Sequence, residues 1–169
     1  SPELLLILDT ETTGLEPSRA QCIELGAVLF HVPSRSVLSQ VSFLMPAQRN
    51  PAQHVNGIAP QITQLSQPWQ AGLTCFESML EAADAVLAHN VAFDEKIVGA
   101  EFLRCGQADL TGSLPRHCTM QGATRYCALP GPYGFKWPSL QELYSKLFGE
   151  TLTGAHRDRK STRLNSSHL

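Results

Sequence analysis

A run of apolar residues that ends on two carboxylates constrains this chain more than any other feature. Residues 4–8 read Leu-Leu-Leu-Ile-Leu, and Asp9-Thr10-Glu11-Thr12-Thr13-Gly14 follows them. Such a run predicts a strand that is buried on both faces. Because a strand points residues i and i+2 to the same side, Asp9 and Glu11 should face a single cation together. The Thr-Thr-Gly sequence at 12–14 then predicts a turn whose backbone passes close to a ligand.

Length and composition predict one globular domain. The chain has 169 residues, of which 43% are hydrophobic and 17% are charged, enough for a single core. It has no apolar stretch as long as a membrane span and no basic signal-peptide region, so we expect no membrane partner. A net charge of −2 argues against broad coating of nucleic acid, but is compatible with a cleft that grips one strand end through metal ions. Five cysteines without metal-ligand spacing favour reduced thiols and a cytoplasmic protein; they are Cys22, Cys75, Cys105, Cys118 and Cys127.

The order of the predicted elements favours an α/β fold. Besides the first strand, strands are expected over residues 22–31, 37–45, 85–88 and 116–120. Helices are expected over residues 74–83, 95–105, 121–127 and 139–148, with loops at 46–58 and 129–138 and a short helical segment that opens at Pro60. Three strands joined by short loops predict an antiparallel meander, and the later alternation of helix and strand predicts a mixed sheet flanked by helices.

A third acid falls near the end of a second core segment. Residues 85–88 lead into His89-Asn90-Val91-Ala92-Phe93-Asp94, where Asn90 can cap a helix and Asp94 lies in its first turns. Three carboxylates suit Mg²⁺ or Mn²⁺ better than zinc or copper, and two such ions can hold a scissile phosphate, create a hydroxide and stabilise the leaving oxygen. His156 would accept a proton from that water. Taken singly, Asp94 is equally explained as a solvated helix-start acid and His156 as a surface histidine.

Three segments together resemble the motifs of the DEDDh family of 3′–5′ exonucleases, which includes the proofreading subunit of bacterial replicative polymerase. The segments are residues 9–15, 89–94 and 154–156. The resemblance implies a ribonuclease H-like fold and release of nucleoside monophosphates from the 3′ end of single-stranded DNA or RNA, with a DNA polymerase as a possible partner. It implies that Asp9, Glu11 and Asp94 bind two Mg²⁺ or Mn²⁺ ions and that His156 activates water. The residues implied to hold the terminal nucleotide are Thr12, Leu15, Asn56, Gly57, Ile58, Asn90 and Phe93.

The last dozen residues break sharply from the preceding pattern. Residues 158–168 match, residue for residue, the translation of a common sequencing-library adapter; the alternative is a disordered basic tail. We therefore interpret residues 158–169 as an adapter-derived, non-native tail and residues 1–157 as an exonuclease domain truncated at its C-terminus. Members of the family carry a fourth acid five residues after the histidine, where this chain has Ser161. The expectation is an exonuclease that is impaired as this polypeptide.

Two other functions stay open from the sequence alone. One is a catalytically inactive module that binds nucleic-acid ends, which requires Ser161 to be native. The other is a metal-dependent hydrolase of short oligoribonucleotides. A motif does not reveal a 2′-hydroxyl contact, so the sequence leaves DNA and RNA open as substrates.

Overall fold

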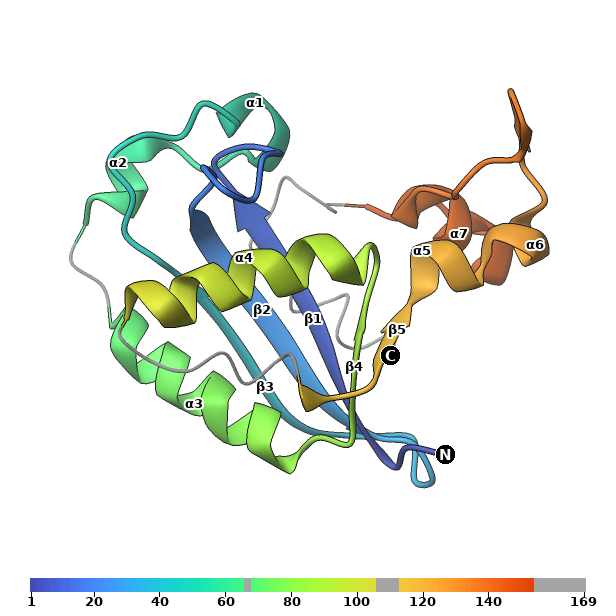
Figure 1. The fold of residues 1–169 in the computed structure, drawn as a ribbon, viewed down its shortest axis with the longest axis horizontal. Helices are drawn as coiled ribbons and strands as arrows, with labels where there is room; N and C mark the ends of the chain where they lie inside the picture. Colours follow the sequence, from blue (N-terminus) through green and yellow to red (C-terminus); the bar gives the residue numbers. More distant parts are fainter. Residues whose placement is uncertain (66–67, 106–112, 154–169) are drawn as a thin grey trace.

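The central feature of the protein is a five-stranded mixed sheet with the order β3-β2-β1-β4-β5 (Figure 1). The structure is a computed structural model that describes residues 1–65, 68–105 and 113–153. The strands β1 (Leu4–Thr12), β2 (Cys22–His31) and β3 (Ser36–Leu44) form the predicted antiparallel meander. The short strands β4 (Ala85–Ala88) and β5 (Arg116–Cys118) run parallel to β1. The predicted mixed sheet is therefore confirmed, and its central strand is the one that carries Asp9 and Glu11.

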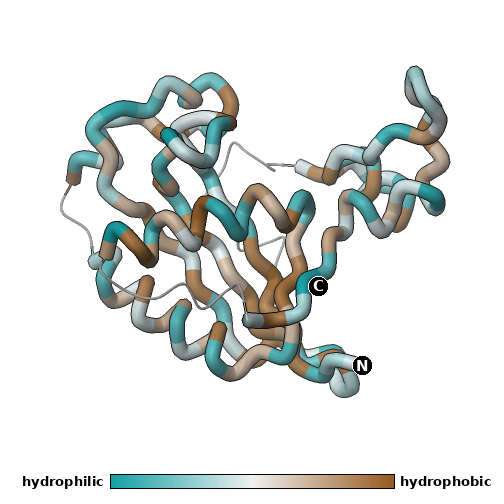
Figure 2. The backbone as a smooth tube through the Cα atoms, viewed as in Figure 1, coloured by the Kyte–Doolittle hydropathy of each residue, from teal (hydrophilic) through white to brown (hydrophobic). Residues whose placement is uncertain are grey.

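Two long helices cover one face of this sheet (Figure 1). They are α3 (Trp69–Ala82) and α4 (Val91–Arg104), and the rings of Phe76 and Phe102, one from each, stack with centroids 6.0 Å apart. On α3, a Cβ at Gly72 would clash with the Phe43 ring of β3, so glycine allows the close approach of helix and strand. The hydrophobic colouring of Figure 2 is concentrated where the strands meet these helices.

The burial of β1 differs from the prediction of a strand enclosed on both faces. Leu6 and Leu8 are buried, whereas Leu5 and Ile7 are half-buried. The even-numbered residues face the core that α3 and α4 complete, and the odd-numbered ones face the other side of the sheet. The strand is thus buried more deeply on one face, because the long helices pack on that face.

Short elements account for most other differences from the sequence prediction. A one-turn helix, α1 (Gln53–Asn56), lies in the segment expected to be irregular, and α2 (Pro60–Thr63) begins at the predicted proline. Two one-turn helices, α5 (Thr119–Gly122) and α6 (Thr124–Cys127), replace a single predicted helix; the break falls at Ala123, directly after Gly122, a poor helix former. A small hairpin of β6 (Pro130–Gly131) and β7 (Gly134–Phe135) replaces a loop, and Gly134 has the positive φ of 118° that its turn requires.

The last described helix is capped as its sequence predicts. α7 (Leu140–Phe148) begins after Ser139, which forms a reciprocal capping box with Glu142. It ends at Gly149, whose φ of 67° is left-handed. Within residues 1–65, 68–105 and 113–153, no helix has the length and apolar character needed to cross a membrane.

Candidate active site

Asp9 and Glu11 share one face of β1, as the strand period predicts. Thr10 and Thr12 between and after them are buried on the opposite face. In the antiparallel register Asp9 lies opposite Gly26 and Glu11 lies opposite Glu24. Residues opposed in this way share a face, so Glu24 adds a third acidic side chain beside the pair. The place of Glu24 depends on strand register, which the sequence alone does not give.

Asp94 approaches the same end of β1 from the other face of the sheet. It lies in the first turn of α4 and is 4% exposed. Thr10 Oγ1 donates a hydrogen bond of 2.6 Å to Asp94 Oδ1. The residue between Asp9 and Glu11 is therefore the one that holds the third carboxylate. Sequence reasoning missed this role of Thr10, although strand alternation already turns it away from the two acids.

The three acids influence one another electrostatically. Burial raises the pKa of Asp94 to about 7, the Thr10 hydrogen bond opposes that rise, and the charges of Asp9 and Glu11 add to it. One pKa unit corresponds to about 1.4 kcal/mol, so the raised pKa means that a negative charge on Asp94 is costly beside Asp9 and Glu11. A cation bound near these acids would offset that cost. Negatively charged oxygen donors gathered at one strand end suit a hard divalent metal ion.

This donor set is not already arranged as a metal cage. Among the residues that the structure describes, no group of three His, Cys, Asp or Glu side chains is placed to hold a metal ion together. One Asp94 oxygen is directed at Thr10, and the two β1 acids lie on the opposite face. The chemistry of the residues fits Mg²⁺ or Mn²⁺, and their simultaneous coordination requires the side chains to turn toward the strand end.

The turn before α4 has an unusual backbone. Asn90 is the N-cap residue, as predicted, but its φ of 71° is left-handed and its side chain makes no capping hydrogen bond. Its backbone oxygen instead accepts from the Phe93 amide at 3.0 Å. A left-handed non-glycine residue is uncommon and such residues cluster at functional sites. The Asn90 side chain is consequently left exposed beside the acids' end of the sheet.

Asn56 fixes a loop against the end of β1. Its Nδ2 donates to the Thr12 oxygen at 3.0 Å, and its Oδ1 accepts from the Ile58 amide at 3.0 Å and from Asn50 Nδ2 at 2.8 Å. The side chain is buried. That Asn56 holds the terminal nucleotide stays a prediction; the contacts seen here suit a positioning residue. Gly57, which follows it, is exposed with a left-handed φ of 70°.

The remaining predicted nucleotide contacts differ in accessibility. Leu15 is 90% exposed, whereas Ile58 is buried against Ile23 and Ala47. Phe93 is half-buried against the main core. Thr12 Oγ1 donates to the Gly14 oxygen at 2.6 Å and so closes the turn after β1. A hollow of about 260 Å³ adjoins this turn and is lined by Thr13, Gly14, Leu15, Glu16, Arg19, Ala20 and Pro51.

His89 connects the acidic strand end to the later part of the chain. Its Nδ1 lies 2.9 Å from Thr119 Oγ1 and its Nε2 lies 2.9 Å from the Pro138 oxygen. A carbonyl only accepts, so Nε2 carries a proton. Sequence reasoning gave His89 no role of its own, because its partners lie 30 and 49 residues away. His156 and the rest of the 154–156 segment, like Ser161, lie outside the described residues.

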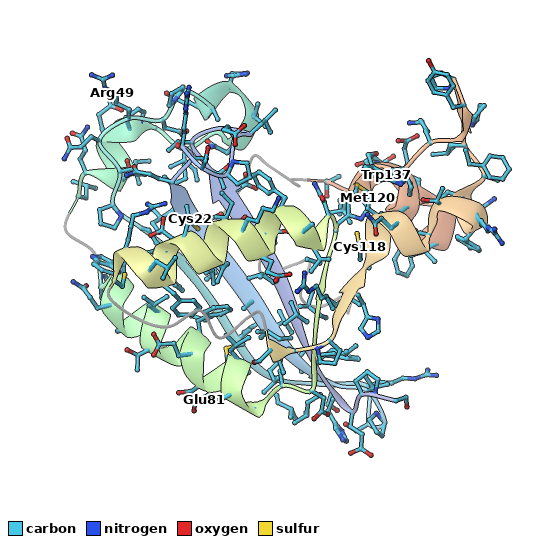
Figure 3. All side chains as sticks on the ribbon, in the orientation of Figure 1. Cys22, Arg49, Glu81, Cys118, Met120 and Trp137 are labelled. Carbon is cyan, nitrogen blue, oxygen red and sulfur yellow. The ribbon has the colours of Figure 1, made fainter. Side chains whose placement is uncertain are left out.

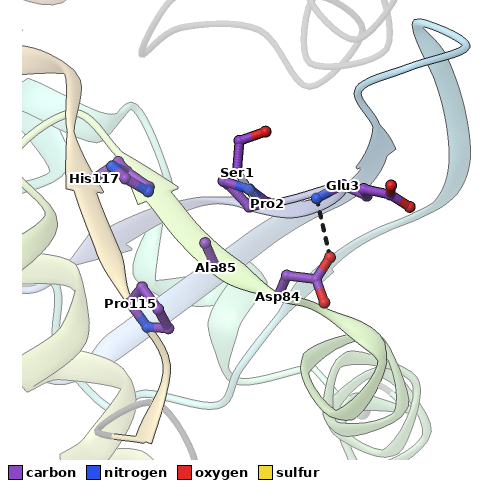
Figure 4. A pocket seen from close by; sticks show the side chains of 7 residues that line it. All are labelled: Ser1, Pro2, Glu3, Asp84, Ala85, Pro115 and His117. Carbon is purple, nitrogen blue, oxygen red and sulfur yellow. Dashed lines mark hydrogen bonds between the residues drawn. The ribbon is translucent and has the colours of Figure 1, made fainter.

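A second hollow is remote from this chemistry. It measures about 530 Å³ and lies at the start of β1 and β4, the end of the sheet opposite Asp9 (Figure 4). Asp84 lines it and accepts hydrogen bonds from the Glu3 and Leu4 amides, which lower the pKa of its carboxyl. These bonds anchor the first residues of β1, so we assign Asp84 a structural role.

Among the solved structures similar to this chain are three of exonuclease I, two of which are of the E. coli protein. The zinc-bound form with single-stranded DNA has 20% identity and a TM-score of 0.74, covering 98% of this chain and 39% of that one. The complex with a dT13 oligonucleotide has 17% identity, a TM-score of 0.72 and coverages of 98% and 40%. A structure described as suggesting how processivity is achieved has 20% identity, a TM-score of 0.69 and coverages of 91% and 37%.

These likenesses establish the fold. The chain spans about two fifths of the length of the exonuclease I structures. A comparison with curated protein sequences gave no match. The model of the RNase T type exonuclease family matches residues 6–158, which is most of the chain and includes the acids of β1 and α4. This protein therefore belongs to the RNase T exonuclease family.

Proposed function

We propose that this protein is a metal-dependent 3′–5′ exonuclease that releases nucleoside monophosphates from the 3′ ends of nucleic acids. The observation that carries the proposal is that Asp9 and Glu11, at the end of β1, lie near enough to Asp94 to raise its pKa, while Thr10 joins the strand to α4. Membership of an exonuclease family supplies the reaction class. The polarity of digestion rests on the motif resemblance.

The proposed metal site consists of Asp9, Glu11 and Asp94, with two Mg²⁺ or Mn²⁺ ions as the natural occupants. When bound, such ions supply Lewis-acid activation of water and stabilise the leaving oxygen. The protein's own contribution is to hold the acids: Thr10 orients Asp94, and burial keeps the Asp94 carboxylate in surroundings of low dielectric. His156 is proposed to accept the proton of the attacking water. The zinc-bound form of E. coli exonuclease I supports a divalent metal in this fold.

The proposed substrate is a single strand with a free 3′ end. E. coli exonuclease I is seen in complex with single-stranded DNA, which supports this choice while RNA stays an alternative. Partnership with a DNA polymerase and a cytoplasmic location are further parts of the proposal, supported by the motif resemblance and by the reduced cysteines. Ser161 at the expected fourth acidic position supports weakened metal binding in this polypeptide.

Ser161 also favours one second function, an inactive module that binds nucleic-acid ends. Both proposals predict binding of a strand end, and only the first predicts cleavage. They are separated by incubating the full chain with a 5′-labelled dT12 oligonucleotide, with Mn²⁺ or with EDTA. The exonuclease yields a ladder shortened from the 3′ end together with free dTMP, and EDTA abolishes both.

Two variants complete this experiment. Asp9→Asn removes a proposed ligand and should abolish the ladder. Glu81→Gln removes an exposed acid of α3, labelled in Figure 3, and should leave it unchanged. Binding of dT12 without Mn²⁺-dependent cleavage would support the inactive module. Cleavage that Asp9→Asn does not reduce would indicate a contaminating nuclease and remove the basis of the proposal.

A further inference from the structure

Charge is divided unevenly along the described chain. Residues 1–65 and 68–105 contain eleven acidic and five basic side chains, whereas residues 113–153 contain four basic and two acidic ones. The first part is therefore strongly acidic and the second is basic. The second part comprises β5 to α7, which lie together at one side of the molecule, right in Figure 1. A polyanion approaching the protein is attracted to this side.

The same part holds all the exposed aromatic side chains of the described residues. They are Tyr126 at 54%, Tyr133 at 101%, Phe135 at 57%, Trp137 at 59% and Phe148 at 52% exposure. Tyr133, Phe135 and Trp137 lie on or next to the β6–β7 hairpin, and residues 130–137 are called the aromatic hairpin below. Exposed aromatic groups gathered in this way are typical of a binding surface.

Basic side chains stand beside these rings. Lys146 Nζ lies 5.8 Å from the centre of the Tyr126 ring, a cation–π contact. Lys136 is paired with Glu142 at 2.8 Å and Arg116 with Glu95 at 3.0 Å. The salt bridges found within the described ranges do not involve Arg125 or Lys146. These two cations are therefore the best placed to meet phosphates.

The aromatic hairpin is anchored to the acidic strand end. His89 immediately precedes the left-handed Asn90 and the helix that carries Asp94. Its ring contacts Thr119 at the start of α5 and the Pro138 oxygen, one residue beyond Trp137. In Figure 3, Trp137 lies near Met120 and Cys118, in the part of the molecule from β5 to α7, and away from α3. A strand that ends at the acids can thus reach these rings.

We propose that the aromatic hairpin, with Arg125 and Lys146, binds single-stranded nucleic acid outside the catalytic site. Bases stack on exposed aromatic rings whatever their sequence, and the cations pair with phosphates. A strand with a 3′ end at the acids would be held at a second point along its length. This inference rests on the proposed function for the identity of the strand. The basic charge of this part of the chain favours a polyanion over a protein partner.

The binding test uses Trp137 as a probe. The chain has two tryptophans, so Trp69→Phe leaves Trp137 as the single indole. Titration with dT12 in EDTA should quench its fluorescence by stacking. Tyr133→Ala with Phe135→Ala should weaken dT12 binding about tenfold. Leu103→Ala, an exposed apolar residue of α4 at 70% exposure, is the matched control and should leave the affinity unchanged.

Salt dependence tests the role of charge. Arg125→Gln should lower the slope of log K against log salt by about 0.7, as expected for one phosphate contact on a single strand. Arg35→Gln, on the turn between β2 and β3, is the control and should leave the slope unaltered. If both variants have the same slope, Arg125 is not part of the proposed binding surface.

Kinetics separate this inference from the proposed function. In Mn²⁺, the Tyr133→Ala, Phe135→Ala chain should show a raised KM for dT12 and an unchanged kcat/KM for a dinucleotide, because the proposed contact is made outside the catalytic site. Binding of dT12 by the hairpin without any cleavage overturns the proposed function alone. Unchanged dT12 affinity in this variant overturns the hairpin proposal alone. Self-association that depends on the three rings and is insensitive to dT12 would also overturn it, by assigning the surface to a protein contact.

Discussion

The 2.6 Å hydrogen bond from Thr10 Oγ1 to Asp94 Oδ1 joins two residues that are 84 positions apart in the sequence. It brings the first turn of α4 to the end of β1, where Asp9 and Glu11 face the other side of the strand. The bond also gives a buried carboxylate a neutral donor and opposes the rise in its pKa. The geometry of the proposed metal site therefore depends on a residue that is not itself a proposed ligand.

Replacing Thr10 with valine should impair Mn²⁺-dependent cleavage by about tenfold to a hundredfold, the range expected when a hydrogen bond to a charged group is lost. Valine keeps the shape of threonine, so the fold should persist. Without the donor, the pKa of Asp94 rises further, because this bond lowers it. The pH at which Mn²⁺-dependent activity reaches half of its maximum should consequently be higher in the variant.

The matched control for that experiment is Thr10→Ser, which keeps a hydroxyl donor. It should restore most of the activity and the original pH dependence. A purely structural role for Thr10 would lower activity equally at every pH, and such a uniform loss would contradict the positioning role.

Asp94→Asn should stabilise the metal-free protein at neutral pH. The folded pKa of about 7 lies above the ordinary value of 3.8, so the unfolded chain loses this proton first. The loss of folding stability caused by the charge on Asp94 is absent below pH 3.8, grows as pH rises, and is complete above about pH 7. Asparagine carries no charge and should therefore raise the free energy of unfolding by roughly 2–4 kcal/mol at pH 8. Urea unfolding in EDTA measures the difference, which should shrink toward pH 4.

Mn²⁺ should reverse the relative stability of the wild type and the Asp94→Asn variant. In saturating Mn²⁺ the wild type gains stability by binding through Asp94, and the variant gains less. A variant that stays more stable than wild type in Mn²⁺ would argue against Asp94 as a ligand. Glu95→Gln, the neighbouring acid in an ion pair with Arg116, is the charge control and should not show the pH-dependent gain.

Asn56→Ala should destabilise the fold by about 2–4 kcal/mol, because it leaves several buried partners without hydrogen bonds. Those partners are the Thr12 oxygen, the Ile58 amide and Asn50. Urea unfolding gives the change, and the exposed Gln53→Ala in the same short helix serves as the control. If Asn56 instead acted by contacting nucleotide, KM would rise with no change in stability.

The parts of this molecule that were predictable from sequence are those fixed by local patterns. The strand over 22–31, the strand over 85–88 and the acids of β1 follow from apolar runs and a period of two. The one-turn α1 and the two-residue β6 are too short to produce such a pattern. Contacts between distant segments were also out of reach: the Thr10–Asp94 bond depends on how α4 packs, and the place of Glu24 depends on strand register.

The gene should encode an acid in place of Ser161. This follows from the match of residues 158–168 to an adapter and from the family's fourth acid at that spacing. Independent sequencing through the codons after His156 tests it directly. A chain restored to the gene sequence should bind Mn²⁺ at least tenfold more tightly than the present one, since a fourth carboxylate adds an anionic ligand. Confirmation of Ser161 in the gene would contradict the adapter interpretation and favour the inactive binding module.

His89→Ala should loosen the part of the chain from α5 to α7 without unfolding the sheet. The imidazole bridges Thr119 and the Pro138 oxygen, and these bonds tie that part to the end of β4. Alanine should therefore increase hydrogen exchange at the amides of residues 119–148 by about fivefold or more, equivalent to a loss of roughly 1 kcal/mol of local stability. Amides of β1 and β2 should keep their protection, since their ladder does not involve His89. His117→Ala, an exposed histidine of β5, is the control.

Because the aromatic hairpin is held through the same two bonds, His89→Ala should also weaken dT12 binding. Normal binding together with faster exchange would show that the hairpin does not need a fixed position to hold a strand.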